Sequence, residues 1–156
     1  MDERLDSGSG SRWGSVLRRV ALVSGALFLA LQLVPYGWQH ENPPDEVVAQ
    51  FPNRRAAALW KSACADCHSN RTNWPAWSFV APVSWLVRHD VDEGREKFNA
   101  SDWDRSRRKA DDAAEEIEEG GMPPDEYTLL HPDAKLSDAE KQVLIDALEE
   151  MDRDSG

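Results

Sequence analysis

The chain has 156 residues, which is room for one modest domain and an appendage. Its formal net charge is −11, and this acidity argues against nucleic acid as a partner, because phosphate binding needs a basic face. The acidic excess lies after Glu41, so the two parts of the chain are expected to face different surroundings.

The N-terminal part contains an uncharged apolar stretch, residues 20–38, preceded by Arg18 and Arg19. Its length is close to the roughly 20 residues that a helix needs to cross the hydrocarbon layer. The positive-inside rule then predicts a cytoplasmic tail (1–16) and a single-pass transmembrane anchor (17–38) in a bacterial cytoplasmic membrane. The remainder would be periplasmic or extracytoplasmic. A cleaved signal peptide is the main alternative. A buried core helix is disfavoured because apolar residues occupy every side.

The segment after the anchor, residues 39–53, contains three prolines and is predicted to be a linker. A helix is expected next, over residues 54–68, with Asn53 as its N-cap. This helix ends on the only two cysteines of the chain. Residues 69–82 hold prolines and three aromatic residues, which indicates an irregular packed loop.

The remaining pattern is helical. Apolar residues at helical spacing predict a helix over 82–99, and a third helix should run from a cap at Ser101 to residue 119, where the sequence GGMPP stops it. Ser137 and Glu140 form a capping box before a last amphipathic helix. No segment alternates with period two. We therefore predict an all-α fold, with residues 54–152 as one helical domain.

Both cysteines fall in the sequence CADCH, residues 64–68. C-x-x-C followed at once by His is the signature of c-type haem attachment. Cys64 and Cys67 lie one helical turn apart, so both sulfurs can form thioethers with the vinyl groups on one edge of a porphyrin, while His68 presents a ring nitrogen to the iron. The motif predicts one covalent haem c. Attachment of this kind takes place outside the cytoplasm, in agreement with the export inferred from the anchor.

Three other interpretations of the motif remain open. A redox dithiol uses C-x-x-C, but normally at a helix start after a strand, and no βαβ pattern is present. A structural disulfide is compatible with an oxidising compartment, yet it leaves His68 unexplained. A zinc site needs a fourth ligand, and the chain has no second cysteine pair.

The sixth iron ligand decides between two functional classes, because an iron with two protein ligands mostly carries electrons and an iron with one can bind small molecules. Met122, in the glycine–proline loop GGMPP, is the first candidate. The alternative is His131. Met filling the core is the ordinary explanation for a lone methionine, although such residues usually lie on a helix face.

The chain resembles the haem-binding domain family of small membrane-anchored c-type cytochromes. The matching stretches include CADCHSNRTNWPAWSFVAPVSWLV, EGREKFNASDW and EEIEEGGMPPDEYTLLHPDAKLSDAEKQVL. The resemblance implies covalent haem at Cys64 and Cys67, iron ligation by His68 and a cytochrome c-like helical fold. It does not identify the sixth ligand or a redox partner.

The expected function is therefore one-electron transfer by a carrier that is not itself an enzyme. Trp74 and Trp77, close to the iron ligand in sequence, are candidates for packing against the haem. The acidic run 111–126 is either the solvated face of a helix or a surface that steers a basic redox partner. The alternative functions are a five-coordinate haem sensor or peroxidase-like protein, and a haem-free thiol oxidoreductase.

Overall fold

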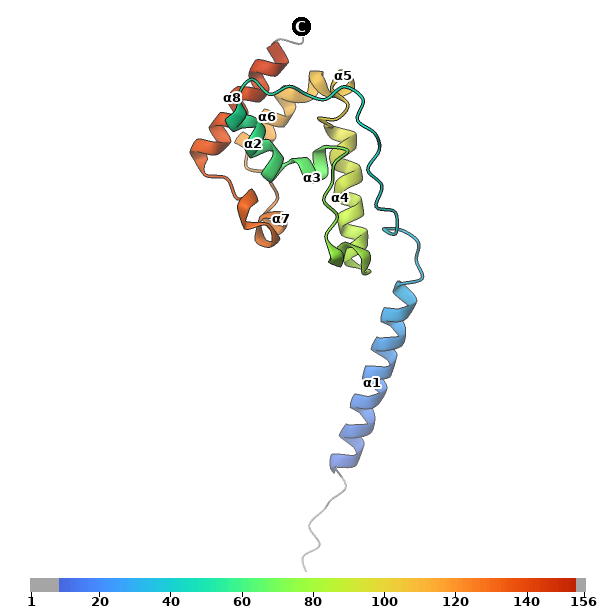
Figure 1. Ribbon diagram of the computed structural model, residues 1–156. Helices are drawn as coiled ribbons and strands as arrows, with labels where there is room; N and C mark the ends of the chain where they lie inside the picture. The colour runs from blue at the N-terminus through green and yellow to red at the C-terminus, as the bar shows by residue number, and fades with distance from the viewer. Residues whose placement is uncertain (1–8, 154–156) are drawn as a thin grey trace, which may run out of the picture.

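The computed structural model describes residues 9–153 of the chain (Figure 1). Its helices are α1 (Ser9–Leu31), α2 (Arg54–Ala63), α3 (Ala65–His68), α4 (Val83–Lys97), α5 (Trp103–Ser106), α6 (Ala110–Glu118), α7 (Asp125–Leu130) and α8 (Asp138–Arg153). Three short 3₁₀ turns complete the set: η1 (Ala76–Phe79), η2 (Arg107–Lys109) and η3 (Pro132–Ala134). No strand occurs in residues 9–153, so the prediction of an all-α fold is confirmed.

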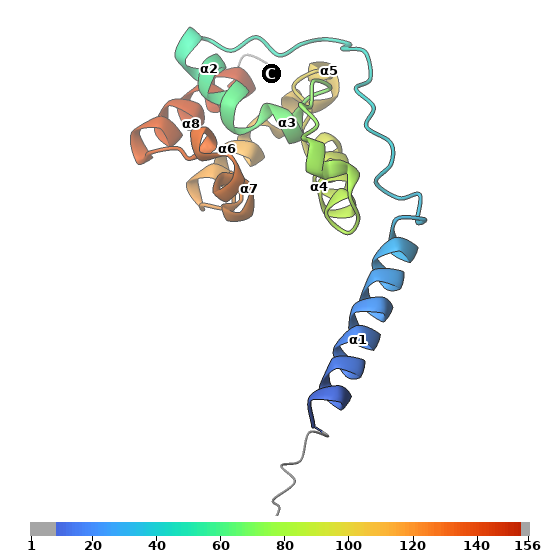
Figure 2. The ribbon, with the colours of Figure 1, turned by 60° about the horizontal axis from the view of Figure 1, so that its bottom comes forward.

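Helix α1 extends away from the other helices (Figures 1 and 2) and none of its apolar window is buried. Residues 12–31 form a helix long and apolar enough to cross a membrane. The helix ends at Leu31, so the predicted anchor 17–38 extends beyond it. Pro35 limits the helix, because it has no N–H to donate to the carbonyl of Leu31 and it disfavours helical conformation at Val34. Of the predicted tail, residues 1–8 lie outside the described part of the chain.

The predicted linker has no helix but is fastened along the domain. The backbone N–H groups of Glu46 and Ala49 donate to the carbonyls of Ser101 (2.9 Å) and Ala100 (2.8 Å). Trp103 N–H donates to the carbonyl of Val47 (2.7 Å). The linker therefore follows the domain surface, as the trace in Figure 1 shows.

The core of the domain lies where α2 and α6 pack against α8. It is built from apolar side chains that include Trp60, Phe98, Ile117, Leu144 and Leu148. The predicted apolar face of the last helix is buried at Leu144, Ala147, Leu148 and Met151, and Ile145 joins it. Asn53 is the N-cap of α2, as predicted, because its side-chain oxygen accepts the N–H of Ala56 (2.8 Å).

Several predicted boundaries were wrong. The helix predicted over 54–68 breaks at Cys64, and the one predicted from Ser101 is divided into α5, η2 and α6. Ser101 is not a cap: it is buried, and its hydroxyl accepts the N–H of Asn70 (3.1 Å). Half of the capping box forms, since the Ser137 N–H donates to the Glu140 carboxylate (2.9 Å). The short helix α7 was not predicted.

Candidate functional site

The CADCH sequence forms a single helical turn. The N–H of His68 donates to the carbonyl of Cys64 (2.9 Å), and so does the N–H of Cys67 (3.2 Å). The break before α3 separates this turn from α2, because Cys64 leaves helical backbone angles at φ −127°. The turn thus has its own orientation, and both cysteines and the histidine line the same cavity.

Side chains on either side hold this turn in place. The Asp66 carboxylate accepts the N–H of Asn73 (3.0 Å) and the hydroxyl of Tyr127 (3.0 Å). These two bonds tie α3 to the following loop and to α7. Burial, together with the negative charge of Asp66, raises the pKa of Tyr127, so the phenol stays a donor.

The His68 imidazole is oriented by a backbone carbonyl. Its Nδ1 lies 2.9 Å from the carbonyl oxygen of Phe98. A carbonyl only accepts, so Nδ1 carries the proton and Nε2 keeps its lone pair. Burial lowers the pKa of His68, which favours the neutral ring that metal ligation requires. Such a hydrogen bond behind a ligand is the common arrangement for a metal-binding histidine.

The two thiols do not have the properties of a redox pair. Burial raises the pKa of Cys64 and of Cys67 to about 12, whereas reactive dithiols have depressed pKa values because the thiolate is the nucleophile. Both cysteines are free. Within residues 9–153, no group of three His, Cys, Asp or Glu side chains converges on a possible metal position. The raised pKa values of the two thiols thus disfavour the dithiol interpretation.

The turn opens onto a large cavity of about 860 Å³, within the range of about 300–1,000 Å³ that is usual for cofactor and ligand pockets. Helices α2 and α3 form one side, η1 and α4 a second, and α6 with α7 the third. Apolar and aromatic walls suit a flat macrocycle, and Cys64, Cys67 and His68 are placed at one end of the lining. The donor set and the space therefore fit a covalently attached haem.

The two predicted haem-packing residues, Trp74 and Trp77, lie in different places. Trp77, on η1, lines the cavity, but Trp74 is not among the lining residues. The Trp74 Nε1 donates to the side-chain oxygen of Asn42 (3.2 Å), and its ring lies edge-on to His40. The structure therefore gives Trp74 a contact with the linker and does not bring it to the cavity.

Met122 lines the cavity on the side of α6. Helix α6 ends at Glu118, and Gly120, two residues later, has a φ of +82°, a left-handed conformation that glycine adopts without strain. The chain then turns back, so that the N–H groups of Gly121 and Met122 both donate to the carbonyl of Glu116 (2.9 and 3.1 Å). These bonds fix the backbone at Met122 while its side chain faces the cavity.

His131, the alternative ligand, also lines the cavity. Its Nδ1 lies 3.1 Å from the Tyr127 carbonyl oxygen. Its ring stacks on the ring of Tyr127, with the two ring centroids 4.2 Å apart. Because Nδ1 donates to a carbonyl, Nε2 is the available acceptor, as in His68. The structure brings both candidate sixth ligands to one cavity.

Sequence reasoning missed Tyr127, Asp66 and the Phe98 carbonyl. Two acidic residues in the first turn of α7, directly after two prolines, are a helix-start signal that could have found Tyr127. Asp66 carried no signal beyond its place inside the motif. A backbone carbonyl has no residue-type signal at all, so the partner of His68 could only be found in the folded chain.

The comparisons with known proteins support haem binding. No solved structure matches the chain. One curated relative, a cytochrome c peroxidase of Escherichia coli (strain K12), is 23% identical over 137 residues, which cover 79% of this chain. The chain spans only 30% of that protein. The model of the haem-binding domain family matches residues 26–150. Because this match covers most of the chain, the chain belongs to the haem-binding domain family.

Proposed function

We propose that the protein is a membrane-anchored c-type cytochrome that carries one electron at a time. One haem would be attached through thioether bonds to Cys64 and Cys67, with Nε2 of His68 as an iron ligand. The observation that carries the proposal is the hydrogen bond from His68 Nδ1 to the Phe98 carbonyl. This bond leaves Nε2 of the half-buried imidazole free to accept, on the same turn that carries both thiols.

The bound haem supplies a one-electron redox couple, and the chain sets its environment. Met122 would be the second protein ligand of the iron, because its backbone is fixed by hydrogen bonds beside the cavity. A methionine ligand opposite a histidine raises the reduction potential relative to two histidines. The protein would then be a comparatively oxidising carrier.

Acidic side chains mark one side of the cavity. Helix α6 contributes Asp112, Glu115 and Glu116 to the lining. We propose that this side attracts a basic redox partner, since complementary charge raises the rate of encounter. Lys97 and Lys109 also line the cavity, so the acidic charge is partly offset there.

The experiment that tests the proposal is a pyridine haemochrome assay on the full chain, expressed with haem-attachment machinery. We expect the spectrum of a haem with both vinyl groups saturated, and an intact mass increased by one haem. The variant with both Cys64→Ala and Cys67→Ala should lose the covalent mass. Free or mutually oxidised thiols with no added tetrapyrrole in the parent protein would refute the proposal.

Haem peroxidase chemistry is the second candidate. It is favoured by the similarity to the cytochrome c peroxidase, and it requires an open iron position rather than two protein ligands. Carbon monoxide binding to the reduced protein separates the two functions. Slow or partial binding supports a carrier, whereas rapid, full binding together with peroxide turnover supports the peroxidase.

Placement in the membrane is part of the proposal. We propose that α1 stays uncleaved as a single-pass anchor in a bacterial cytoplasmic membrane and that the domain lies on the extracytoplasmic side. The apolar helix over residues 12–31 supports it. Protease treatment of intact spheroplasts should digest the domain, and N-terminal sequencing should find the chain uncleaved.

A further inference from the structure

One stretch of the domain differs from the rest in charge. Charged residues make up 30% of the chain, yet residues 72–87, between Arg71 and Arg88, contain none. This stretch forms the end of the loop after the haem-binding turn, then η1, and then the first turn of α4. The haem-binding role explains only part of it, because only some of these residues line the cavity.

The same stretch exposes large apolar side chains. Phe79 is 59% exposed and Val80 is 43% exposed. Neither residue lines the cavity, so a haem in the cavity would not cover them. Val83 and Leu86, beside them on α4, are 40% and 53% exposed and do line the cavity. We call Phe79, Val80, Val83 and Leu86 the apolar corner; such a group on a soluble surface marks an interaction site.

The end of α1 is joined directly to this corner. Gln32, the first residue after α1, pairs its side-chain amide with the backbone of Ala81. Gln32 Nε2 donates to the Ala81 carbonyl (3.0 Å), and Gln32 Oε1 accepts the Ala81 N–H (3.0 Å). The two hydrogen bonds place the apolar corner at the end of α1, which both ribbon views show (Figures 1 and 2).

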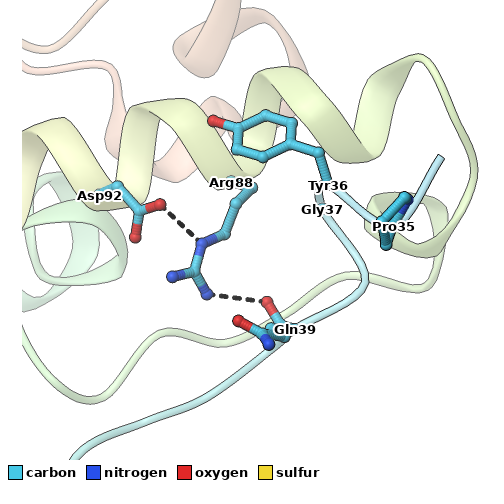
Figure 3. A pocket seen from close by; sticks show the side chains of 6 residues that line it. All are labelled: Pro35, Tyr36, Gly37, Gln39, Arg88 and Asp92. Carbon is cyan, nitrogen blue, oxygen red and sulfur yellow. Dashed lines mark hydrogen bonds and ion pairs between the residues drawn. The ribbon is translucent and has the colours of Figure 1, made fainter.

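Further contacts make the junction a fixed one. His40 stacks on Phe79 with ring centroids 3.8 Å apart. On the next face of α4, Arg88 donates from Nη1 to the Gln39 carbonyl (2.9 Å) and from Nε to Asp92 (2.7 Å), as Figure 3 shows. The segment between α1 and the domain is thus held along α4 and is not a free tether.

From these contacts we infer that the apolar corner rests in the headgroup layer of the phospholipid bilayer that α1 crosses. The inference rests on the proposed membrane anchor. Tyr36 and Trp38, exposed at the same junction, are the residue types that gather at the membrane–water interface. An uncharged, apolar surface held at the end of a membrane span meets lipid before any other partner.

Helix α7 extends the same surface. It lies on the side of the domain that faces α1 in both ribbon views. Leu129 on this helix is 80% exposed and lies outside the cavity lining, while the neighbouring Leu130 is part of it. Leu129 therefore adds a second exposed apolar side chain on the side of the domain that faces α1, while Asp90 of α4 and Glu126 of α7 are acidic residues that line the cavity.

The test uses nitroxide labels on the full, haem-loaded chain in vesicles of phosphatidylcholine and phosphatidylglycerol. Labels are attached at Val80→Cys and Leu129→Cys, and the matched control is Asp104→Cys, an exposed position on α5 at the other end of the domain. The parent protein, treated with the same reagent, measures background labelling of Cys64 and Cys67. Collisions with oxygen, which concentrates in lipid, are compared with collisions with a water-soluble nickel chelate.

We expect an oxygen-to-nickel collision ratio several-fold higher at position 80 than at position 104, with position 129 between them. A ratio at position 80 equal to that at position 104, in protein that floats with the vesicles, overturns the inference and leaves the anchor intact. A label at position 80 shielded from both reagents indicates a protein contact and also overturns it. Failure to float with the vesicles refutes the anchor itself.

Discussion

Gly94 provides the sharpest test of how the haem-binding turn is positioned. This glycine lies inside α4 and faces α3. A Cβ placed there would come within 2.7 Å of the Cys67 carbonyl oxygen and 3.1 Å of both the Cys67 carbonyl carbon and Cβ. The nearest of these are backbone atoms, which cannot rotate away. A side chain at position 94 must therefore push α4 and the turn apart.

The size of the effect follows from two opposed contributions. To reach an ordinary contact of 3.4 Å from 2.7 Å, the two segments must separate by 0.7 Å. Overpacking of this kind costs about 1–3 kcal/mol. Alanine is favoured over glycine inside a helix by about 0.5–1 kcal/mol, which offsets part of the cost. Gly94→Ala should therefore lower the free energy of unfolding by about 0–2.5 kcal/mol, with a central value near 1 kcal/mol.

The assay is guanidinium unfolding of the holoprotein, followed by far-UV circular dichroism and by Soret absorption. Glu96→Ala is the matched control, since it places alanine at an exposed position of the same helix, and it should be near neutral. Displacing Cys67 also moves His68, so the Soret maximum and reduction potential should shift in Gly94→Ala alone. A Gly94→Ala protein that is more stable than the parent, or equally stable with an unshifted Soret maximum, would refute the close approach of α4 to the turn.

Three more outcomes are expected. Met122→Ala should abolish the thioether charge-transfer absorption at the red end of the oxidised spectrum. If the spectrum of Met122→Ala is unchanged and that of His131→Ala is altered, the ligand is His131 instead. Tyr127→Phe removes the hydrogen bond to Asp66 and should cost about 0.5–1.5 kcal/mol in denaturant unfolding, with Tyr36→Phe as the neutral control. Electron exchange with a basic redox protein should slow as salt rises, because screening shortens the reach of the acidic side from about 10 Å at 0.1 M to about 3 Å at 1 M; rates that ignore salt would contradict steering.

The parts of the fold that the sequence predicted depend on local rules. Asn53 caps α2 because a side-chain oxygen three residues before an N–H is enough to make the bond. The turn of the CADCH sequence follows from spacing alone, and the last helix from its apolar period. Each of these features is decided within a few residues, so tertiary context does not have to be known.

The parts that failed depend on tertiary contacts. Ser101 has the residue type of a helix cap, but the folded chain uses its hydroxyl to accept the N–H of the buried Asn70. Trp74 and Trp77 have equal claims as haem-packing residues by sequence distance. The turn η1 carries Trp77 to the cavity, while Asn42 of the linker offers Trp74 an acceptor. Neither outcome could be decided without knowing where the linker runs.

The linker also connects the CADCH turn to α1. Arg95 of α4 donates to the carbonyls of Ser69 (2.9 Å) and Glu41 (3.1 Å), and to the side-chain oxygens of Asn42 (3.0 Å) and Thr72 (2.9 Å). One guanidinium thus joins the residue after His68 to the linker. Together with the bonds between Gln32 and Ala81, these contacts connect the end of α1 to the CADCH turn. A flexible tether would let the site search a large volume for its partner. A fastened one holds it at a set distance from the end of α1; under the proposed function, a redox partner would then have to come to the membrane surface to exchange an electron.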